Sequence, residues 1–195
     1  MKRIFDLVLS LFGIVVLLPV FLVVAVSIVM SSKGPVLFRQ ERVGRNGLTF
    51  RILKFRSMRA ANEGRQITVA GDSRITPVGG VLRKTKLDEL PQLFNVLRGD
   101  MSFVGPRPEV QRYVDLYPPE VKRIVLSVRP GITDNAAIEF RNESDLLADA
   151  ADPEAEYVGT ILPRKLALYR QYVETRSFGG DLRILLRTLV AVVSH

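Results

Sequence analysis

The adjacent carboxylates Asp88 and Glu89 are the residues of this sequence best placed to do chemistry. The sequence around them is basic, with the cationic side chains Arg83, Lys84, Lys86, Arg98 and Arg107. That setting suits a phosphate, but two carboxylates repel a phosphate unless a cation joins them. Mg²⁺ resolves the conflict, because it binds one or two carboxylates together with substrate phosphates. Alternatively, one carboxylate is itself the nucleophile, as in aspartyl-phosphate chemistry.

Composition narrows the choice of nucleophile. The chain of 195 residues contains no cysteine, so disulfides, Cys-ligated zinc and thiolate nucleophiles are excluded. Its single histidine, His195, is the last residue, where chains usually fray. Asp88 or Glu89 is therefore the best nucleophile available, although a carboxylate pair also serves in many proteins simply as a helix cap.

The segment 87–97 is predicted to form a helix that begins at this acidic pair. Pro91 falls in its first turn and Gly99 follows its end, which is typical of helix boundaries. The apolar residues at helical spacing on one face are Leu90, Leu93, Phe94 and Leu97. A helix start offers free N–H groups and a partial positive charge, which favour a phosphate there.

Two arginines lie in proline-rich segments outside this helix. Arg107 stands between Pro106 and Pro108 in a stiff loop, and Arg129 precedes Pro130-Gly131. The planar guanidinium fork grips phosphate oxygens, whereas the ordinary role of an arginine is a structural or surface ion pair. The sequence has neither a Walker-type phosphate loop nor a Gly-x-Gly-x-x-Gly run, so it is neither a P-loop protein nor an evident dinucleotide binder.

The net charge of +8 is concentrated in one part of the chain. Residues 33–112 hold 16 of the 28 Lys and Arg but only 7 of the 20 Asp and Glu. Such a stretch implies an anionic partner, which is phosphate, anionic lipid or nucleic acid. Aromatic residues make up only 8%, with no interleaved Arg-aromatic platform, so nucleic acid is not expected. The alternatives to an enzyme are a non-catalytic, membrane-tethered binder of anionic lipid or nucleic acid, and a scaffold with a dead site.

The N-terminal apolar segment, residues 7–30, carries no charge over 24 residues. As a straight helix it would be about 36 Å long, enough to cross a hydrocarbon core of about 30 Å. Pro19 lies in its middle, where it kinks a helix, and Lys2, Arg3 and Lys33 make both flanks basic. Because positive charge prefers the cytoplasmic side, we predict a re-entrant helix that enters and leaves by the same face. A spanning helix and a buried soluble helix are the alternatives.

The predicted fold class is α/β, mainly helical with a small β-hairpin. The hairpin pairs strands at 36–43 and 48–55 across a Gly-rich turn at 44–47. The other elements expected are a polar loop at 60–74, a helical or extended piece at 78–84, helices at 109–117, 119–128 and 163–175, a turn at 129–131, and surface helix and loop at 144–156. Segment 181–193 is an amphipathic helix that lies either on the membrane surface or on its own domain.

Five strings of this sequence resemble, in the same order, those of the bacterial sugar transferase family, the small monotopic phosphoglycosyl transferases. They lie at 34–44, 54–58, 83–93, 99–108 and 129–133, and they follow an apolar segment with a proline in its middle. The most specific are Leu-Asp-Glu-Leu-Pro-Gln at 87–92 and Gly-Pro-Arg-Pro at 105–108. The resemblance covers roughly residues 1–135.

The resemblance implies a reaction in two steps. Asp88 attacks the sugar-bearing phosphate of a UDP-sugar, UMP leaves, and a covalent phosphosugar–aspartate remains. Polyprenyl (undecaprenyl) phosphate then attacks that intermediate and becomes polyprenyl-diphosphate-sugar, the start of a surface glycan. Glu89 holds the cofactor Mg²⁺, and Arg83 acts beside the acidic pair as a third catalytic residue.

The resemblance also implies substrate-binding residues and a location. The residues expected to bind phosphates or the nucleotide are Lys54, Arg56, Arg107, Arg129 and Thr133. A re-entrant membrane helix at 1–32, broken at Pro19, anchors a catalytic domain at 33–195. That domain sits on the cytoplasmic face of the bacterial inner membrane, with membrane lipid as a partner and a homodimer left open.

The sequence departs from the family's common pattern after Thr133. Many members continue with Gly and then an Ala-Gln-Val-x-Gly-Arg run, whereas this chain continues with Asp134-Asn135-Ala136. The resemblance therefore leaves the sugar and the nucleotide undetermined, but not the phosphoryl chemistry.

Overall fold

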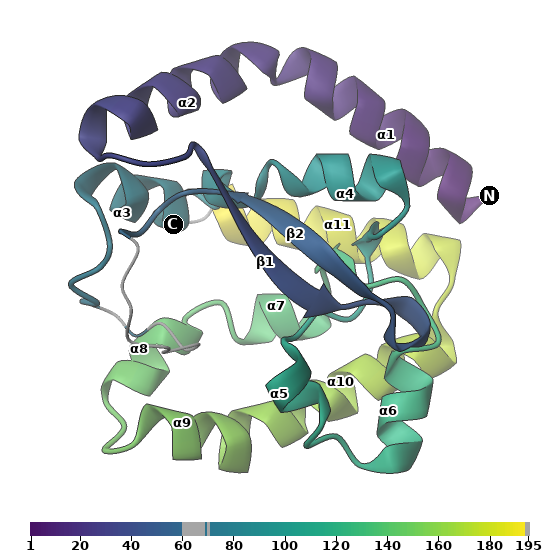
Figure 1. The fold of residues 1–195 in the computed structure, drawn as a ribbon. Helices are drawn as coiled ribbons and strands as arrows, with labels where there is room; N and C mark the ends of the chain where they lie inside the picture. The colour runs from purple at the N-terminus through teal and green to yellow at the C-terminus, as the bar shows by residue number, and fades with distance from the viewer. Residues whose placement is uncertain (60–68, 70, 194–195) are drawn as a thin grey trace.

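The computed structural model describes residues 1–59, 69 and 71–193. Most of the loop predicted at 60–74 lies outside the described residues, as does His195. The described part is mainly helical, with two small two-stranded sheets, which confirms a helical chain with a small hairpin (Figure 1). A bent pair of helices, α1 (Lys2–Val16) and α2 (Leu18–Ser31), arches along one side of the molecule (Figure 1).

The break in the N-terminal helix lies at Leu17, two residues before the predicted position at Pro19. The two helices are bent by 61° there. Pro19 is the second residue of α2 and has no N–H with which to continue the hydrogen bonds of α1. Within the described residues, no helix alone has the length and apolar character to cross a membrane, whereas the bent pair taken together has both. The re-entrant arrangement stays a prediction.

The predicted hairpin is confirmed. Strands β1 (Leu37–Val43) and β2 (Thr49–Phe55) pair in antiparallel fashion along their whole length. In the turn between them, Asn46 and Gly47 have φ angles of 58° and 78°. Asn and Gly tolerate this left-handed conformation better than other residues, which explains the turn at this point of the chain.

A second sheet, absent from the prediction, pairs strands β3 (Ser102–Val104) and β4 (Gly131–Thr133) in parallel. The turn predicted at 129–131 is therefore wrong at its last residue, which begins β4. The two backbones approach so closely that a Cβ on Gly131 would lie 2.2 Å from the nitrogen of Gly105. The pairing brings the segments that follow both strands, from Gly105 and from Asp134, to the same edge.

The single helix predicted over 87–97 is wrong in its first part. The chain instead forms a 3-10 turn, η2 (Leu87–Glu89), and then a separate helix, α4 (Gln92–Arg98). Pro91 is the N-cap of α4, and Lys86 before the turn has a φ of 57°. The two carboxylates therefore belong to a tight turn and not to the first turn of an α-helix, so the predicted helix-start phosphate site is not formed there. The end of α4 at Gly99, with φ 97°, is as predicted.

The remaining helices surround this centre. They are α3 (Pro77–Lys84), α5 (Gln111–Val114), α6 (Pro119–Val125), α7 (Asn135–Glu139), α8 (Glu143–Ala148), α9 (Pro153–Glu156), α10 (Leu162–Thr175) and α11 (Phe178–Val193), with a π-helical turn at Tyr157–Ile161. The structure selects the helical alternative at 78–84 and confirms the helix at 163–175. The predicted helix at 109–117 shrinks to α5, and Pro118 disfavours the helical conformation at Tyr117 directly before it.

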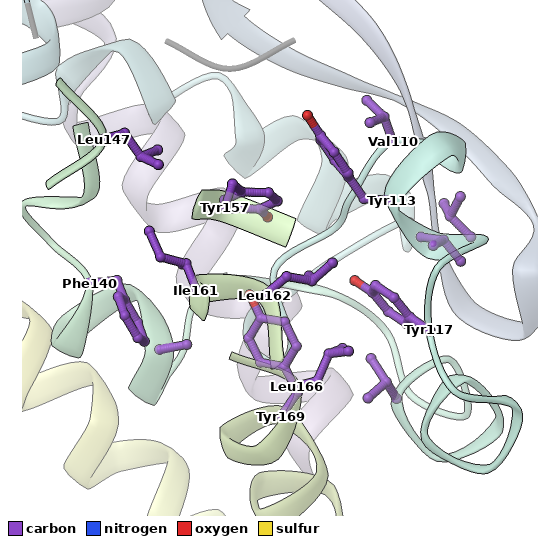
Figure 2. Close-up of a cluster of buried hydrophobic side chains, with 14 residues drawn as sticks. Val110, Tyr113, Tyr117, Phe140, Leu147, Tyr157, Ile161, Leu162, Leu166 and Tyr169 are labelled. Atoms are coloured by element: carbon purple, nitrogen blue, oxygen red, sulfur yellow. The ribbon is translucent and has the colours of Figure 1, made fainter. Parts of the chain in front are cut away.

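The largest apolar cluster holds α5, α6 and α10 together, and Figure 2 shows its tyrosines and aliphatic side chains in contact. Its most buried members include Val114, Leu147 and Tyr169, each 1% exposed. On α11, Ile184 packs into the domain, whereas Leu186 and Leu189 stay exposed. The predicted apolar face of this helix is thus divided, because Leu185 packs against the domain whereas Leu182, Leu186 and Leu189 are exposed.

Candidate active site

Glu89 is the centre of a half-buried ion-pair cluster. Its Oε1 accepts hydrogen bonds from Lys54 Nζ at 2.8 Å and from Arg107 Nη2 at 2.5 Å. Its Oε2 accepts a further one from Arg107 Nη1 at 3.3 Å. Lys54 comes from β2, Glu89 from η2, and Arg107 from the loop after β3. Three residues predicted to serve one site therefore meet in the structure.

This cluster fixes the charge of its members. Burial alone would raise the pKa of Glu89, but the charges and hydrogen bonds of Arg107 and Lys54 outweigh burial and lower that pKa well below its usual value. Glu89 in turn raises the pKa of Arg107. Burial lowers the pKa of Lys54, and Glu89 opposes that shift. Glu89 is thus an ionised carboxylate bound between two cationic side chains.

Asp88 differs from Glu89 in its hydrogen bonding. The residue is 6% exposed, and its Oδ1 has no hydrogen-bond partner within the described part of the chain. Burial raises the pKa of Asp88, Lys54 opposes the shift, and the like charge of Glu89 adds to it. Both oxygens of Glu89 therefore accept hydrogen bonds from cations, whereas one buried oxygen of Asp88 has no partner among the described residues.

Arg83 lies near Asp88, whereas the hydrogen bonds of Arg56 go to the end of α2. Arg83, on α3, is close enough to Asp88 for its charge to lower the pKa of that carboxyl, and its Nη1 donates to Met58 Sδ at 3.8 Å. Arg56 instead lies at the end of α2, where its Nη2 donates to the carbonyl of Ser32 at 2.6 Å and to the Ser32 hydroxyl at 3.1 Å. Its contacts in the described structure thus join the end of α2 to the end of β2.

Arg129 and Thr133 border the second sheet, and their hydrogen bonds within the described residues go to elements other than the acidic turn. Arg129 Nε donates to the carbonyl of Gly99 at 2.8 Å, just after α4. The hydroxyl of Thr133 shares a hydrogen bond of 2.7 Å with that of Thr188 on α11. Both residues therefore join neighbouring elements of the protein around β4.

A sequence profile of the family described as bacterial sugar transferase matches residues 1–195. The chain belongs to the bacterial sugar transferase family. It is 36% identical over 198 residues to the UDP-glucose:undecaprenyl-phosphate glucose-1-phosphate transferase of Caulobacter vibrioides, covering 99% of this chain and 70% of that one. It is 39% identical over 206 residues to the exopolysaccharide production protein PSS of Rhizobium leguminosarum bv. phaseoli, covering 100% and 96%.

The match to a third relative is confined to part of that protein. The UDP-N-acetylgalactosamine-undecaprenyl-phosphate N-acetylgalactosaminephosphotransferase of Aeromonas hydrophila is 46% identical over 141 residues, which are 70% of this chain but 33% of the relative. Together these matches confirm the resemblance found in the sequence motifs and the prediction that the chain is a transferase.

In this bacterial sugar transferase, Asp134 is a buried titratable residue to which no sequence motif assigns a role. It is 1% exposed, and its Oδ1 accepts a hydrogen bond from the N–H of Ala137 at 2.9 Å. Its Oδ2 has no hydrogen-bond partner among the residues that the structure describes. Burial raises the pKa of Asp134 to about 6, against the opposing charges of Arg107 and Lys165. An Asp before a short helix is a cap signal, which could have predicted the hydrogen bond but not the burial.

We expect Asp134→Asn to stabilise the sugar transferase at neutral pH. Because the folded pKa lies above the unfolded value, the folded protein keeps this proton longer, so stability falls as pH rises from about 4 to about 6. At pH 7.5 the ionised carboxylate lowers the free energy of unfolding by up to about 3 kcal/mol. The neutral amide avoids this penalty and still accepts the hydrogen bond from the N–H of Ala137. Thermal unfolding in detergent should show a gain at pH 7.5 that vanishes near pH 4.

Asp152→Asn is the matched control for this prediction. Asp152 also caps a helix, through bonds from the N–H groups of Glu154 and Ala155, but it is exposed. The Asp152→Asn variant should show no gain in unfolding temperature at pH 7.5 or at pH 4. A gain in Asp134→Asn that is equal at both pH values would contradict the assignment to ionisation.

Proposed function

We propose that this protein transfers sugar-1-phosphate from a UDP-sugar to undecaprenyl phosphate through a covalent phosphosugar intermediate on Asp88. The observation that carries the proposal is the free, buried Oδ1 of Asp88 beside a carboxylate that holds two cations. The names of the Caulobacter and Aeromonas relatives support the substrate classes, since both are undecaprenyl-phosphate sugar-phosphate transferases.

The proposed chemistry is two displacements at one phosphorus atom. In the first, a carboxylate oxygen of Asp88 bonds to the sugar-bearing phosphorus, the bond from that phosphorus to the UMP oxygen breaks, and UMP leaves with the electron pair. In the second, a phosphate oxygen of the polyprenyl phosphate bonds to the same phosphorus and the Asp88 carboxylate is released. The product is polyprenyl-diphosphate-sugar, and the initial carboxylate is restored.

The cations around Asp88 have a defined task in this scheme. A UDP-sugar brings a diphosphate, and charge shifts onto its oxygens as each displacement proceeds. Arg107 and Lys54 are held in place by Glu89, and Arg83 lies near Asp88. These side chains are therefore fixed before substrate arrives, which is the condition under which charged donors stabilise a transition state well.

The same residues fit Mg²⁺ in one particular manner. Within the described residues, no group of three or more Asp, Glu, His or Cys side chains is arranged to hold a metal ion. Mg²⁺ needs fewer, because it takes one or two carboxylates and completes its shell with phosphate oxygens and water. Glu89 would supply the carboxylate for the ion, giving up part of its bonding to Lys54 and Arg107, and Asp88 Oδ1 would stay free to attack. The ion would neutralise phosphate charge.

The proposed acceptor is a lipid, so the site must face a membrane. The exposed apolar side chains of the bent pair support this placement, and they include Val8, Leu11, Phe12, Val15, Leu22, Val23, Val26 and Val29. We propose that α1 and α2 form the re-entrant anchor, that the rest of the chain lies at the cytoplasmic face of the inner membrane, and that the reaction begins a surface glycan.

The test uses the full chain purified in detergent with Mg²⁺. UMP release should be measured with UDP-glucose and UDP-N-acetylgalactosamine, each with and without undecaprenyl phosphate. We expect continuous release only with the lipid, and, without it, a phosphosugar adduct on Asp88 detectable by mass spectrometry. If UMP appears only with the lipid and no adduct forms on any carboxylate, transfer is direct and the covalent step is wrong. If no UMP is released from these or other UDP-sugars, the protein is not this transferase.

A further inference from the structure

Three charged side chains in the first turns of α1, namely Lys2, Arg3 and Asp6, bind the rest of the protein, and we call them the docking cluster. The sequence suggested that Lys2 and Arg3 are simply the basic flank of an apolar segment. In the structure each of them instead donates to backbone carbonyls of other elements, and Asp6 is 2% exposed. These contacts reach β3 and α4, the two elements next to the candidate site, so they do more than attach an anchor.

Asp6 binds the free edge of β3. Its Oδ2 accepts a hydrogen bond from the Ser102 hydroxyl at 2.9 Å, and its Oδ1 accepts one from the N–H of Phe103 at 3.2 Å. The sheet has two strands, so β4 pairs with β3 on one side and Asp6 supplies an acceptor on the other. A buried carboxylate is costly unless it is hydrogen-bonded, and both oxygens of Asp6 are.

Lys2 binds the end of the same strand. Its Nζ donates to the carbonyl of Val104 at 3.0 Å and to Asp181 Oδ2 on α11 at 2.5 Å. The hydroxyl of Tyr172 lies 3.1 Å from that same carbonyl. Val104 is the last residue of β3 and stands three residues before Arg107, so the root of the Arg107 loop is held from α1.

Arg3 binds the other half of the candidate site. Its Nη1 and Nη2 donate to the carbonyls of Val96 and Leu97 at 2.6 Å and 3.1 Å, at the C-terminal end of α4. Helix α4 directly follows the turn that carries Glu89. One turn of α1 therefore contacts both elements that place the Glu89–Arg107 pair.

We propose that the docking cluster positions Arg107 and Glu89 for catalysis, so that the membrane helix is part of the catalytic apparatus. The proposal rests on the proposed function, because it assigns these residues a role in that reaction. Lys2, Arg3 and Asp6 act as positioning residues and do not touch substrate. Displacing a charged donor by about 1 Å costs on the order of 10²-fold in rate, so loosening β3 or α4 lowers turnover.

The central test is Asp6→Ala in the full chain. We expect kcat to fall at least about tenfold, while flotation with phosphatidylglycerol vesicles is unchanged, because the exposed apolar side chains of α1 and α2 remain. Asp6→Asn should restore most of the activity, since the amide still accepts from Phe103 and can donate to Ser102. The matched control is Ser10→Ala, because Ser10 is buried in the same helix but its hydroxyl donates, as far as the described residues go, to the carbonyl of Leu7 in that helix.

A double variant separates positioning from general destabilisation. If Asp6 acts through Arg107, then Asp6→Ala should cause little further loss of kcat in an Arg107→Ala background. If the two losses multiply, or if Asp6→Asn is as inactive as Asp6→Ala, the positioning role is wrong. Loss of vesicle binding in Asp6→Ala would likewise overturn it, since the cluster would then serve only as part of the anchor.

Hydrogen exchange tests the docking without any enzymatic readout. The amide of Phe103 should exchange faster in Asp6→Ala than in wild type or Ser10→Ala, and unchanged exchange would show that the docking is wrong. If wild type releases no UMP while this exchange difference is present, the proposed function fails and the docking remains. Faster exchange with an unchanged kcat would show docking without positioning.

Discussion

Asp88→Asn is expected to abolish sugar-phosphate transfer, with a loss on the order of 10³-fold or more, as is typical when a nucleophile is removed. The amide matches the carboxylate in size but lacks the charge with which to attack phosphorus. The substitution breaks no hydrogen bond of Oδ1, which has no partner in the structure. Steady-state UMP release with a UDP-sugar and undecaprenyl phosphate measures the loss, and mass spectrometry should find no adduct on the variant.

Stability and a control variant show whether such a loss is chemical. Because the pKa of Asp88 is raised on folding, its contribution to stability declines as pH rises from the unfolded pKa through the folded one. The uncharged amide avoids this penalty, so the variant should unfold at the wild-type temperature or above at pH 7.5. Asp115→Asn, at an exposed carboxylate, should leave transfer unchanged. Full turnover of Asp88→Asn would mean that another group is the nucleophile.

Local chemistry made several elements predictable from the sequence. The hairpin follows from two strand-like runs on either side of a turn that needs Asn and Gly, and α4 ends where a glycine adopts a left-handed conformation. The break in the N-terminal helix follows from Pro19, which cannot donate the hydrogen bond that would continue α1. In each case the decisive residue lies within a few positions of the feature that it causes.

Contacts between distant residues were not predictable in the same way. Strands β3 and β4 have three residues each, too few to show a period, and they are set by the close approach of Gly105 and Gly131. Glu89 was a candidate from its neighbours, but Lys54 is 35 residues away and Arg107 is 18. Motifs could place these residues in one site, whereas only the structure shows that Glu89 binds both cations and leaves Asp88 free.

Arg107→Ala is expected to have the second-largest effect, a loss of transfer on the order of 10²-fold, because it removes a preorganised donor from the site. Arg107→Lys should fall between this variant and wild type, since lysine keeps the charge but lacks the two-pronged grip that Arg107 has on Glu89. Initial rates of UMP release at saturating UDP-sugar rank the three proteins. Equal rates in Lys and Ala variants would show that the charge itself is unimportant.

The stability of the Arg107 variants shows whether the Arg107–Glu89 ion pair serves the fold, the reaction or both. The depressed pKa of Glu89 means that this carboxylate adds stability above its unfolded pKa, and that the contribution is lost as pH falls through the folded pKa. Arg107→Ala should therefore lower the free energy of unfolding by up to about 3 kcal/mol at pH 7.5, because Lys54 is then the cation left on Glu89 among the described residues.

Adding Glu89→Gln to Arg107→Ala removes the poorly compensated charge, so the double variant should regain much of that stability. It should stay inactive, because the restored fold would still lack the guanidinium and the carboxylate that the reaction needs. A double variant that regains turnover together with stability would show that Glu89 and Arg107 serve only the fold.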